Sequence, residues 1–398
     1  MVDTLSFLPP LPLVIDYQST TIRARDELGI SHALRLRNRV RRVDLHIPPS
    51  SLRMLLVPMD EHFPILERLS LSSTTDEDTG LIIPKTFLAP NLRHLKLLGI
   101  NLSTELPLLS STASLVTLTL TNIQDSGYFP PKHLITRLRS FRQLEELSIG
   151  FSNPLPHPSA ESEILDALKS PVTLPKLKLF TFSGMSAYLE GLVAQIRAPL
   201  LEQLNVTLFN QTAFALPHLS HFTNTKEGLD ISTAEIIFHY DAVAVVTDHR
   251  RLQLGNRPSS FSLRIMCKIF DRQIDCAAQI CSALRPVLSG VEQLTLVDGA
   301  WLPIDWQGHI DSPIWRKLLR PFVGAKRLHI CRVLLWEIAF ALDLRDAGLD
   351  PGLLPSLQEL AADISERDTD NSFSSFINAR QVAGRPVRLL LSPVPHAQ

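Results

Sequence analysis

The sequence predicts an α/β fold made from one repeated unit, and three observations support this prediction. The pattern LxxLxL, with hydrophobic residues at the L positions, occurs six times between residues 66 and 206. Successive copies begin 23 to 33 residues apart. Segments between the copies, such as His133 to Gln143, carry apolar residues at helical spacing. Strands that alternate with helices in one repeated order predict a parallel sheet.

Each copy ends in two apolar residues separated by one polar residue, as on the buried face of a strand. The L positions are Leu66, Leu69 and Leu71; Leu92, Leu95 and Leu97; Leu115, Leu118 and Leu120; Leu144, Leu147 and Ile149; Leu177, Phe180 and Phe182; and Leu201, Leu204 and Val206. Weaker copies begin near Val40, Lys226, Val291, Ala325 and Leu357. This period is typical of leucine-rich repeats. We therefore predict an irregular leucine-rich-repeat solenoid, with a curved parallel β-sheet on the concave face and helices and loops on the convex face.

The spacing of the copies also predicts how the chain is organised. Residues 1–398 form a single solenoid, in which 1–39 are an N-terminal cap, 40–231 regular repeats, 232–270 a β-rich insertion, 271–372 longer C-terminal repeats, and 373–398 a C-terminal cap and tail. The insertion is inferred because the copies at Lys226 and Val291 lie 65 residues apart. Its sequence predicts two strands around a turn at Tyr240 and Asp241, then a third strand, which together thicken the solenoid.

Composition argues against nucleic acids and membranes as binding partners. Lys plus Arg number 39 and Asp plus Glu 40, so a net charge of -1 gives no global field that would attract nucleic acid or an anionic membrane. No export signal or membrane-spanning helix is visible, and four cysteines do not make a disulfide framework. We therefore expect a cytoplasmic or nuclear monomer that binds neither nucleic acid nor membrane.

Three sets of residues could carry chemistry, and each has a simpler structural interpretation. Cys267, Cys276 and Cys281 match no zinc spacing and are expected in the core. Ser186 lies in a segment similar to a nucleophile elbow but lacks the following glycine, so we expect it to cap a helix. His218 and His221, the third set, are expected at the surface. The sequence therefore predicts no catalytic residue, metal or cofactor, and an enzyme is not expected.

Five arginines gather between Arg35 and Arg42 in the stretch RLRNRVRR. They could form a nuclear-localisation or phosphate-binding patch. In the alternative, Leu28, His32 and Leu36 face inward on a first helix, and Arg41 and Arg42 are solvated residues of the first strand. We favour the alternative, because no aromatic stacking set accompanies the arginines.

Without catalysis, function is expected on the polar residues between the buried leucines. The candidate partner-binding residues of this concave face are Glu67, Arg68, Arg93, His94, Lys96, Thr117, Thr119, Glu145, Glu146, Lys178, Thr181, Glu202, Gln203, Asn205, Glu292 and Gln293. A basic strip from Arg93 to Lys96 is predicted two strands away from the acidic pair Glu145 and Glu146. Such mixed charge suits a protein or peptide better than DNA.

The segments VRRVDLHIP, FPILERLSL, LAPNLRHLKL, GYFPPKHLITRL, VTLPKLKLFTFSGMSAYLEGLV and FINARQVAGRPVRL resemble the leucine-rich-repeat region of F-box-type proteins of mushroom-forming fungi. The resemblance covers nearly the whole chain and implies substrate selection for a cullin-type ubiquitin ligase. Since the first repeat begins near Val40, we expect no F-box within this chain, and an adaptor or cullin partner only if an F-box is missing from the gene model. The sequence thus predicts a non-catalytic protein-recognition module, with a free-standing repeat scaffold as the alternative.

Overall fold

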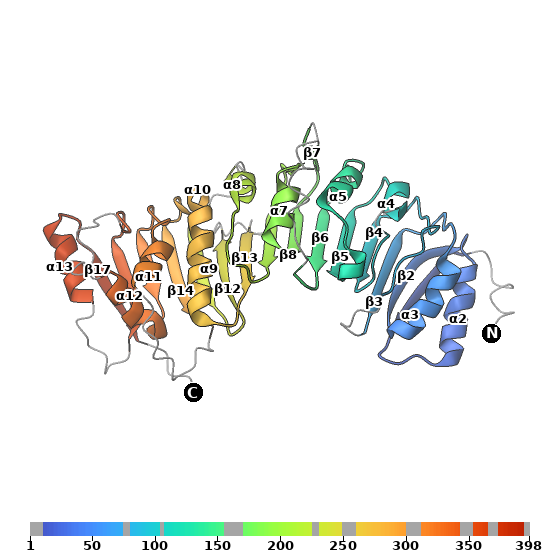
Figure 1. Cartoon of the computed structure of the whole chain (residues 1–398), viewed down its shortest axis with the longest axis horizontal. Helices are drawn as coiled ribbons and strands as arrows, with labels where there is room; N and C mark the ends of the chain where they lie inside the picture. Colours follow the sequence, from blue (N-terminus) through green and yellow to red (C-terminus); the bar gives the residue numbers. More distant parts are fainter. Residues whose placement is uncertain are drawn as a thin grey trace. The chain divides into compact units, whose positions relative to one another are not determined.

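The computed structural model describes residues 11–74, 80–103, 107–154, 170–224, 231–248, 260–299, 312–342, 353–364 and 373–393. The chain divides into two compact units, Met1–Leu201 (unit 1) and Glu202–Gln398 (unit 2), and each is described by itself. Figure 1 shows that both units combine helices with a sheet. The single continuous solenoid stays a prediction.

The sheet of unit 1 is parallel throughout, with the strands in sequence order. They are β1 (Leu13–Gln18), β2 (Val40–Ile47), β3 (Arg68–Ser73), β4 (His94–Leu98), β5 (Thr117–Ile123), β6 (Glu146–Phe151) and β8 (Leu179–Gly184). Two further short strands, β7 (Val172–Thr173) and β9 (Ile196–Arg197), pair with each other outside this sheet. This order confirms the prediction of one strand per LxxLxL copy.

The register of these strands explains why the leucine pattern repeats. Leu69 pairs with Leu95 and Leu95 with Leu118, so residues at the same position of successive copies lie side by side. All L positions of the six strong copies are buried. A single strand could not bury this face alone, and stacked copies give it a continuous apolar core.

Helices cover the buried face of the unit 1 sheet (Figure 1). They are α2 (Ala24–Arg35), α3 (Pro49–Leu56), α4 (Pro107–Ser111), α5 (Pro131–Leu138) and α7 (Ser186–Val193), with the 3-10 turns η1 (Val57–Met59) and η2 (Asp125–Gly127). Proline at the first helical position suits the start of α3 and α5, because that position needs no backbone donor. The apolar face predicted for α5, Leu134, Ile135 and Leu138, is buried.

Three helix predictions are corrected by the structure. In α2 the buried residues are Ile30 and Leu34, whereas Leu28 is 58% exposed and Leu36 36% exposed, so the predicted inward face was wrong. Met185 occupies the N-cap of α7, and Ser186 is instead the first helical residue. The helical spacing of Leu189, Leu192, Val193 and Ile196 predicts a helix that continues toward Pro199, but α7 ends at Val193, because the backbone from Gln195 to Arg197 bonds to β7.

One further prediction cannot be compared with the structure. The helical spacing of Ile164, Leu165 and Leu168 predicts a helix from Glu161 to Ser170. Except for its last residue, this segment lies outside the described residues.

In unit 2 the sheet order departs from the sequence order. The strands are β10 (Gln203–Leu208), β11 (Thr233–Phe238), β12 (Ala242–Asp248), β13 (Ser260–Met266), β14 (Gln293–Asp298), β15 (Arg327–Ile330), β16 (Glu359–Ile364) and β17 (Arg388–Pro393). Their order is β10-β13-β12-β11-β14-β15-β16-β17, and β12 runs antiparallel to both of its neighbours. The predicted three-stranded insertion therefore widens the sheet instead of thickening it, because all three strands find backbone partners within the sheet.

The repeat copy assigned to Lys226 lies five residues too early. In the structure Ile231, Ala234 and Ile236 are buried, and Ala234 and Ile236 pair with Leu294 and Leu296 of β14. The copy therefore begins at Ile231, where isoleucine and alanine replace the leucines for which the pattern was searched.

The remaining elements of unit 2 are mostly helices. They are α8 (Pro217–Asn224), α9 (Phe270–Ala283), α10 (Arg285–Leu288), α11 (Ser312–Leu319), α12 (Leu335–Leu342) and α13 (Ser374–Val382), with the 3-10 turn η4 (Arg332–Leu334). Trp315 of α11 is fully buried and packs edge-on against Phe238 of β11. Aromatic packing of this kind fixes the position of the helix on the sheet.

Candidate recognition surface

The face of the unit 1 sheet opposite its leucine core carries polar side chains in two straight rows. The first row is Arg42, Arg68, His94, Thr117 and Glu146, and the second is Asp44, Ser70, Lys96, Thr119, Ser148 and Thr181. The rows form because the parallel strands pair equivalent residues of successive copies, whatever the length of the segments between them. We call these rows the polar face, and we include Arg41 near the start of β2 and the residues Glu67, Arg93, Glu145 and Lys178 that precede the later strands. None of its residues is buried.

A pocket of about 290 Å³ opens on the polar face at β1 to β4. It is lined by Val14, Arg41, Arg42, Glu67, Arg68, Arg93 and His94. We call it the arginine pocket. The two residues that precede the second L position supply the lining on each strand, so three successive copies contribute two residues each.

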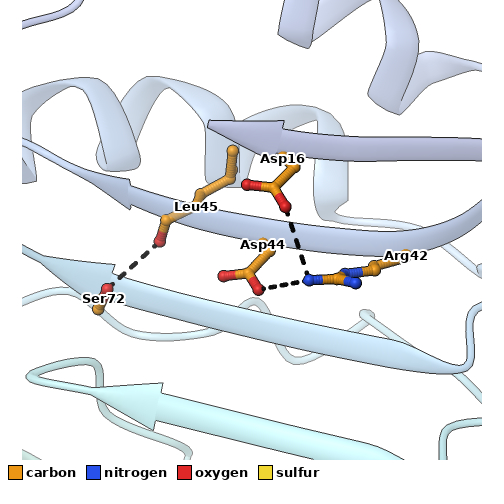
Figure 2. A network of polar contacts seen from close by, with 5 residues as sticks. All are labelled: Asp16, Arg42, Asp44, Leu45 and Ser72. Carbon is orange, nitrogen blue, oxygen red and sulfur yellow. Dashed lines mark hydrogen bonds and ion pairs between the residues drawn. The ribbon is translucent and has the colours of Figure 1, made fainter. Parts of the chain in front are cut away.

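Arg42 is held in place by two carboxylates, Asp44 on its own strand β2 and Asp16 on the adjacent strand β1. Its Nη2 lies 3.1 Å from Asp44 Oδ2 and 3.6 Å from Asp16 Oδ2, as Figure 2 shows. On the adjacent strand the Ser72 hydroxyl donates to the Leu45 carbonyl at 3.5 Å, and lies 2.8 Å from a ring nitrogen of His46. The Nε of Arg42 is buried and has no hydrogen-bond partner among the described residues. The two carboxylates therefore hold the Arg42 guanidinium in a fixed position on the wall of the pocket.

The other arginines of the pocket differ in whether a carboxylate balances them. Arg41 Nε lies 3.0 Å from Glu67 Oε2, so this charge is paired. Within the described part of the chain, Arg68 and Arg93 have no ion-pair partner, although both are close enough to His94 to influence its titration. The pocket therefore contains two uncompensated guanidinium groups on adjacent strands.

His94 pairs with Arg68 across β3 and β4 and directly follows Arg93, and its lowered pKa favours the neutral imidazole near neutral pH. Its Nδ1 is 3.1 Å from Thr117 Oγ1, which ties it to β5. Burial, then Arg68 and Arg93, lowers the pKa of His94, and Glu146 and Glu67 oppose this only in part. A neutral imidazole can either donate or accept a hydrogen bond at the pocket.

Beyond β5 the charge of the polar face changes sign. Glu146 is exposed and stands two strands from His94 in the first row. Glu145 is 3.0 Å from Lys178 Nζ and is thereby neutralised. The predicted separation of the basic and acidic strips by one strand is confirmed. Of the two acidic residues, Glu145 is paired, and Glu146 has no ion-pair partner among the residues that the structure describes.

The candidate residues of unit 2 do not lie on neighbouring strands and so do not form one continuous surface. Gln203 and Asn205 lie on β10 with Glu202 before them, whereas Gln293 lies on β14. Strands β13, β12 and β11 separate β10 from β14. Glu292 is 2.6 Å from Lys326 Nζ and is therefore paired. The sequence pattern places only the copy at Lys226 between those of Asn205 and Gln293, and it does not predict that β13, β12 and β11 lie between them in the sheet.

Sequence reasoning missed Val14, Arg41 and Arg42 as pocket residues. The weak copy at Val40 was recognised, yet its polar positions were not added to the face. Arg42 stands one residue before Val43, as Arg68 stands before Leu69, so the same alignment would have included it. Val14 could not be found in this way, because β1 lacks the leucine pattern.

The arginine cluster between Arg35 and Arg42 disperses in the folded chain. Arg37 pairs with Glu61, and Arg39 Nε donates to the Leu11 carbonyl at 3.2 Å. Arg41 and Arg42 contribute to the arginine pocket. Of the favoured interpretation, the inward face of the first helix was wrong, whereas Arg41 is exposed and Arg42 partly exposed on β2 as expected.

The other residues considered for chemistry lie apart from the polar face. Cys267, Cys276 and Cys281 are buried as predicted, and burial raises the pKa of the Cys276 thiol to about 12. His218 and His221 are exposed on α8. Among the described residues no group of three or more His, Cys, Asp or Glu side chains could hold a metal ion. No helix in the same part of the chain is long and apolar enough to cross a bilayer.

No family model matches the chain, and no curated protein matches it. Among solved structures the chain is similar to the leucine-rich repeat-containing protein LegL7 from Legionella pneumophila. The two chains are 11% identical, the match covers 93% of this chain and 98% of that chain, and the TM-score is 0.32. At this TM-score the likeness supports no conclusion about the function of the chain.

Proposed function

We propose that the chain is a non-catalytic protein-recognition module and that it binds its partner on the polar face of unit 1. The observation that carries this proposal is the in-register arrangement of polar side chains over the leucine core. Rigid strands hold these side chains at fixed spacing, so a partner gains contacts without the cost of ordering a loop.

The charges of the polar face favour a protein partner over a nucleic acid. The arginine pocket is bordered by Asp16 and Asp44, and Glu146 lies farther along the first row. A DNA backbone requires a mainly positive surface, whereas this face mixes both signs. Charges of both signs on a protein interface act through complementarity and select one partner over others.

The resemblance to F-box-type proteins extends this proposal. In that case the polar face would select the substrate of a cullin-type ubiquitin ligase in the cytoplasm or nucleus. The alternative is a free-standing scaffold with no ligase role. Affinity purification of the native gene product distinguishes the two: an adaptor and a cullin recovered with the chain support the ligase role, and their absence alongside other recovered partners supports the scaffold.

Blocking the centre of the polar face tests the proposal. Thr119→Arg with Ser148→Arg places two long side chains on adjacent strands of the second row. A matched control, Thr136→Arg with Ser140→Arg, changes exposed positions in and just after α5. Partners captured by proximity labelling with the wild-type chain should be lost by the first variant and kept by the second. Retention of the partners by the first variant would refute the polar face as the binding surface.

A further inference from the structure

We propose that the arginine pocket and Lys96 bind an extended acidic segment of a partner protein, with carboxylate side chains of the segment seated between Arg68 and Arg93. This inference deepens the proposed function and rests on it, because it names the chemistry that the polar face recognises. It follows from the balance of charges around the pocket, from their spacing, and from the change of sign beyond β5.

The balance of charges shows where an anion is needed. Arg41 and Arg42 already have carboxylate partners, whereas Arg68 and Arg93 have none within the described residues. Lys96, exposed in the second row, is also without an ion-pair partner there. Three uncompensated cations on two adjacent strands repel one another, and an acidic ligand would relieve this repulsion.

The spacing of the cations favours an extended peptide over a single compact anion. Arg93 and Lys96 are three residues apart in sequence, so their Cα atoms are separated by at most about 10 Å. Alternate side chains of an extended acidic segment are about 6.6 Å apart. Two carboxylates of such a segment can therefore reach the pocket and Lys96 at once, whereas one phosphate group is too small to contact cations over this length.

The surroundings of the pocket define the path of the segment. Glu146 would repel acidic side chains beyond β5. On the other side Asp16 and Asp44 hold Arg42 and close the positive region at β1 and β2. The acidic segment therefore lies over β3 and β4, where neutral His94 can offer a hydrogen bond without adding charge.

Fluorescence anisotropy with defined peptides on the full chain tests the proposal. The probe is a fluorescein-labelled peptide of six glutamates, compared with the same peptide made of six glutamines. The first should bind and should weaken as ionic strength rises from about 0.05 to about 0.5 M, because salt screens exposed charges. Equal binding of the two peptides would overturn the proposal.

Charge reversal locates the binding site. Arg68→Glu with Arg93→Glu should weaken hexaglutamate binding about tenfold or more. The control, Lys85→Glu with Arg142→Glu, reverses two exposed cations outside the pocket and should change it less than about twofold. Circular dichroism checks folding, and the milder Arg68→Gln with Arg93→Gln should give an intermediate loss if the reversal variant does not fold. Equal effects of the pocket and control variants would overturn the assignment.

Two comparisons separate this inference from its alternatives. The first comparison uses a peptide with one phosphoserine among glycines. If this peptide binds the chain and hexaglutamate does not, the acidic segment is overturned and a phosphorylated segment is favoured. If the wild-type chain does not bind hexaglutamate but the Thr119→Arg with Ser148→Arg variant loses the captured partners, only the acidic segment is refuted. Hexaglutamate binding at the pocket with all partners retained by that variant would refute only the proposed function.

Discussion

Replacement of Leu95 by Ala tests the register from which the polar face is derived. Leu95 is 1% exposed and lies in β4 between Leu69 of β3 and Leu118 of β5. The change removes about three buried carbon groups, worth roughly 2.4 kcal/mol at about 0.8 kcal/mol each. The cavity left between the two leucines adds to this loss, so the free energy of unfolding should fall by about 2 to 5 kcal/mol.

The neighbouring Lys96 is the internal control. Its side chain is exposed on the opposite face of the same strand, so Lys96→Ala should change the free energy of unfolding by less than about 0.5 kcal/mol. All four tryptophans lie in the second half of the chain. In urea melts of the full chain, circular dichroism therefore follows both units, while tryptophan fluorescence follows unit 2. Equal losses for the two variants would refute the register and with it the polar face.

Further predictions concern the ends, the glycines and the titration of the pocket. Deleting residues 1–39 removes β1 and α2 and exposes the edge of β2, so size-exclusion chromatography should show aggregates; a soluble, cooperatively folding product would contradict the capping role. Gly29→Ala, in open space on α2, should stabilise by roughly 0.5 to 1 kcal/mol. Gly324→Ala should destabilise by about 1 to 3 kcal/mol, because its Cβ would lie 2.4 Å from the Ser289 carbonyl oxygen. Thermal melts that rank these two alanine variants in the opposite order would show that the local packing is wrong. Because the pKa of His94 is lowered in the folded chain, the unfolded chain binds a proton on this imidazole more readily. The contribution of His94 to the free energy of unfolding should therefore be complete above the ordinary pKa of 6.5 and should decline as the pH falls below it. His94→Gln should remove this part of the pH dependence in urea melts from about pH 5 to about pH 8, about 1.5 pH units on either side of the ordinary value. An unchanged profile would contradict the charge environment of the pocket.

The leucine pattern predicted the strands of unit 1 accurately because burial there depends on one simple alternation. Leu69 and Leu71 face the core, and Arg68 and Ser70 face outward, as spacing alone indicates. The helices were less predictable. In α2 the apolar residues Leu28, Ile30 and Leu34 permit more than one inward face, and packing against the sheet selected Ile30 and Leu34.

The inserted strands and the pocket required information that a pattern search does not contain. The order β10-β13-β12-β11-β14 results from backbone pairing between segments far apart in sequence, and it separated Asn205 from Gln293 although their copies follow in series. The uncompensated charge of Arg68 and Arg93 could be seen only once ion pairs had been assigned to Arg41 and Arg42. Sequence therefore predicted which residues face outward, and the structure identified which of them have no ion-pair partner among the described residues.

The most direct test of the central claim is charge reversal on the two sides of unit 1. Arg93→Glu with Lys96→Glu alters the polar face, and Arg137→Glu with Arg139→Glu alters the helical side at the end of α5. Both changes are confined to surface positions and should leave the thermal melt nearly unchanged. Quantitative proximity labelling should show that the polar-face variant loses the partners of the wild-type chain and that the helical variant keeps them. The reverse result, with partners lost only by the helical variant, would contradict recognition through the polar face.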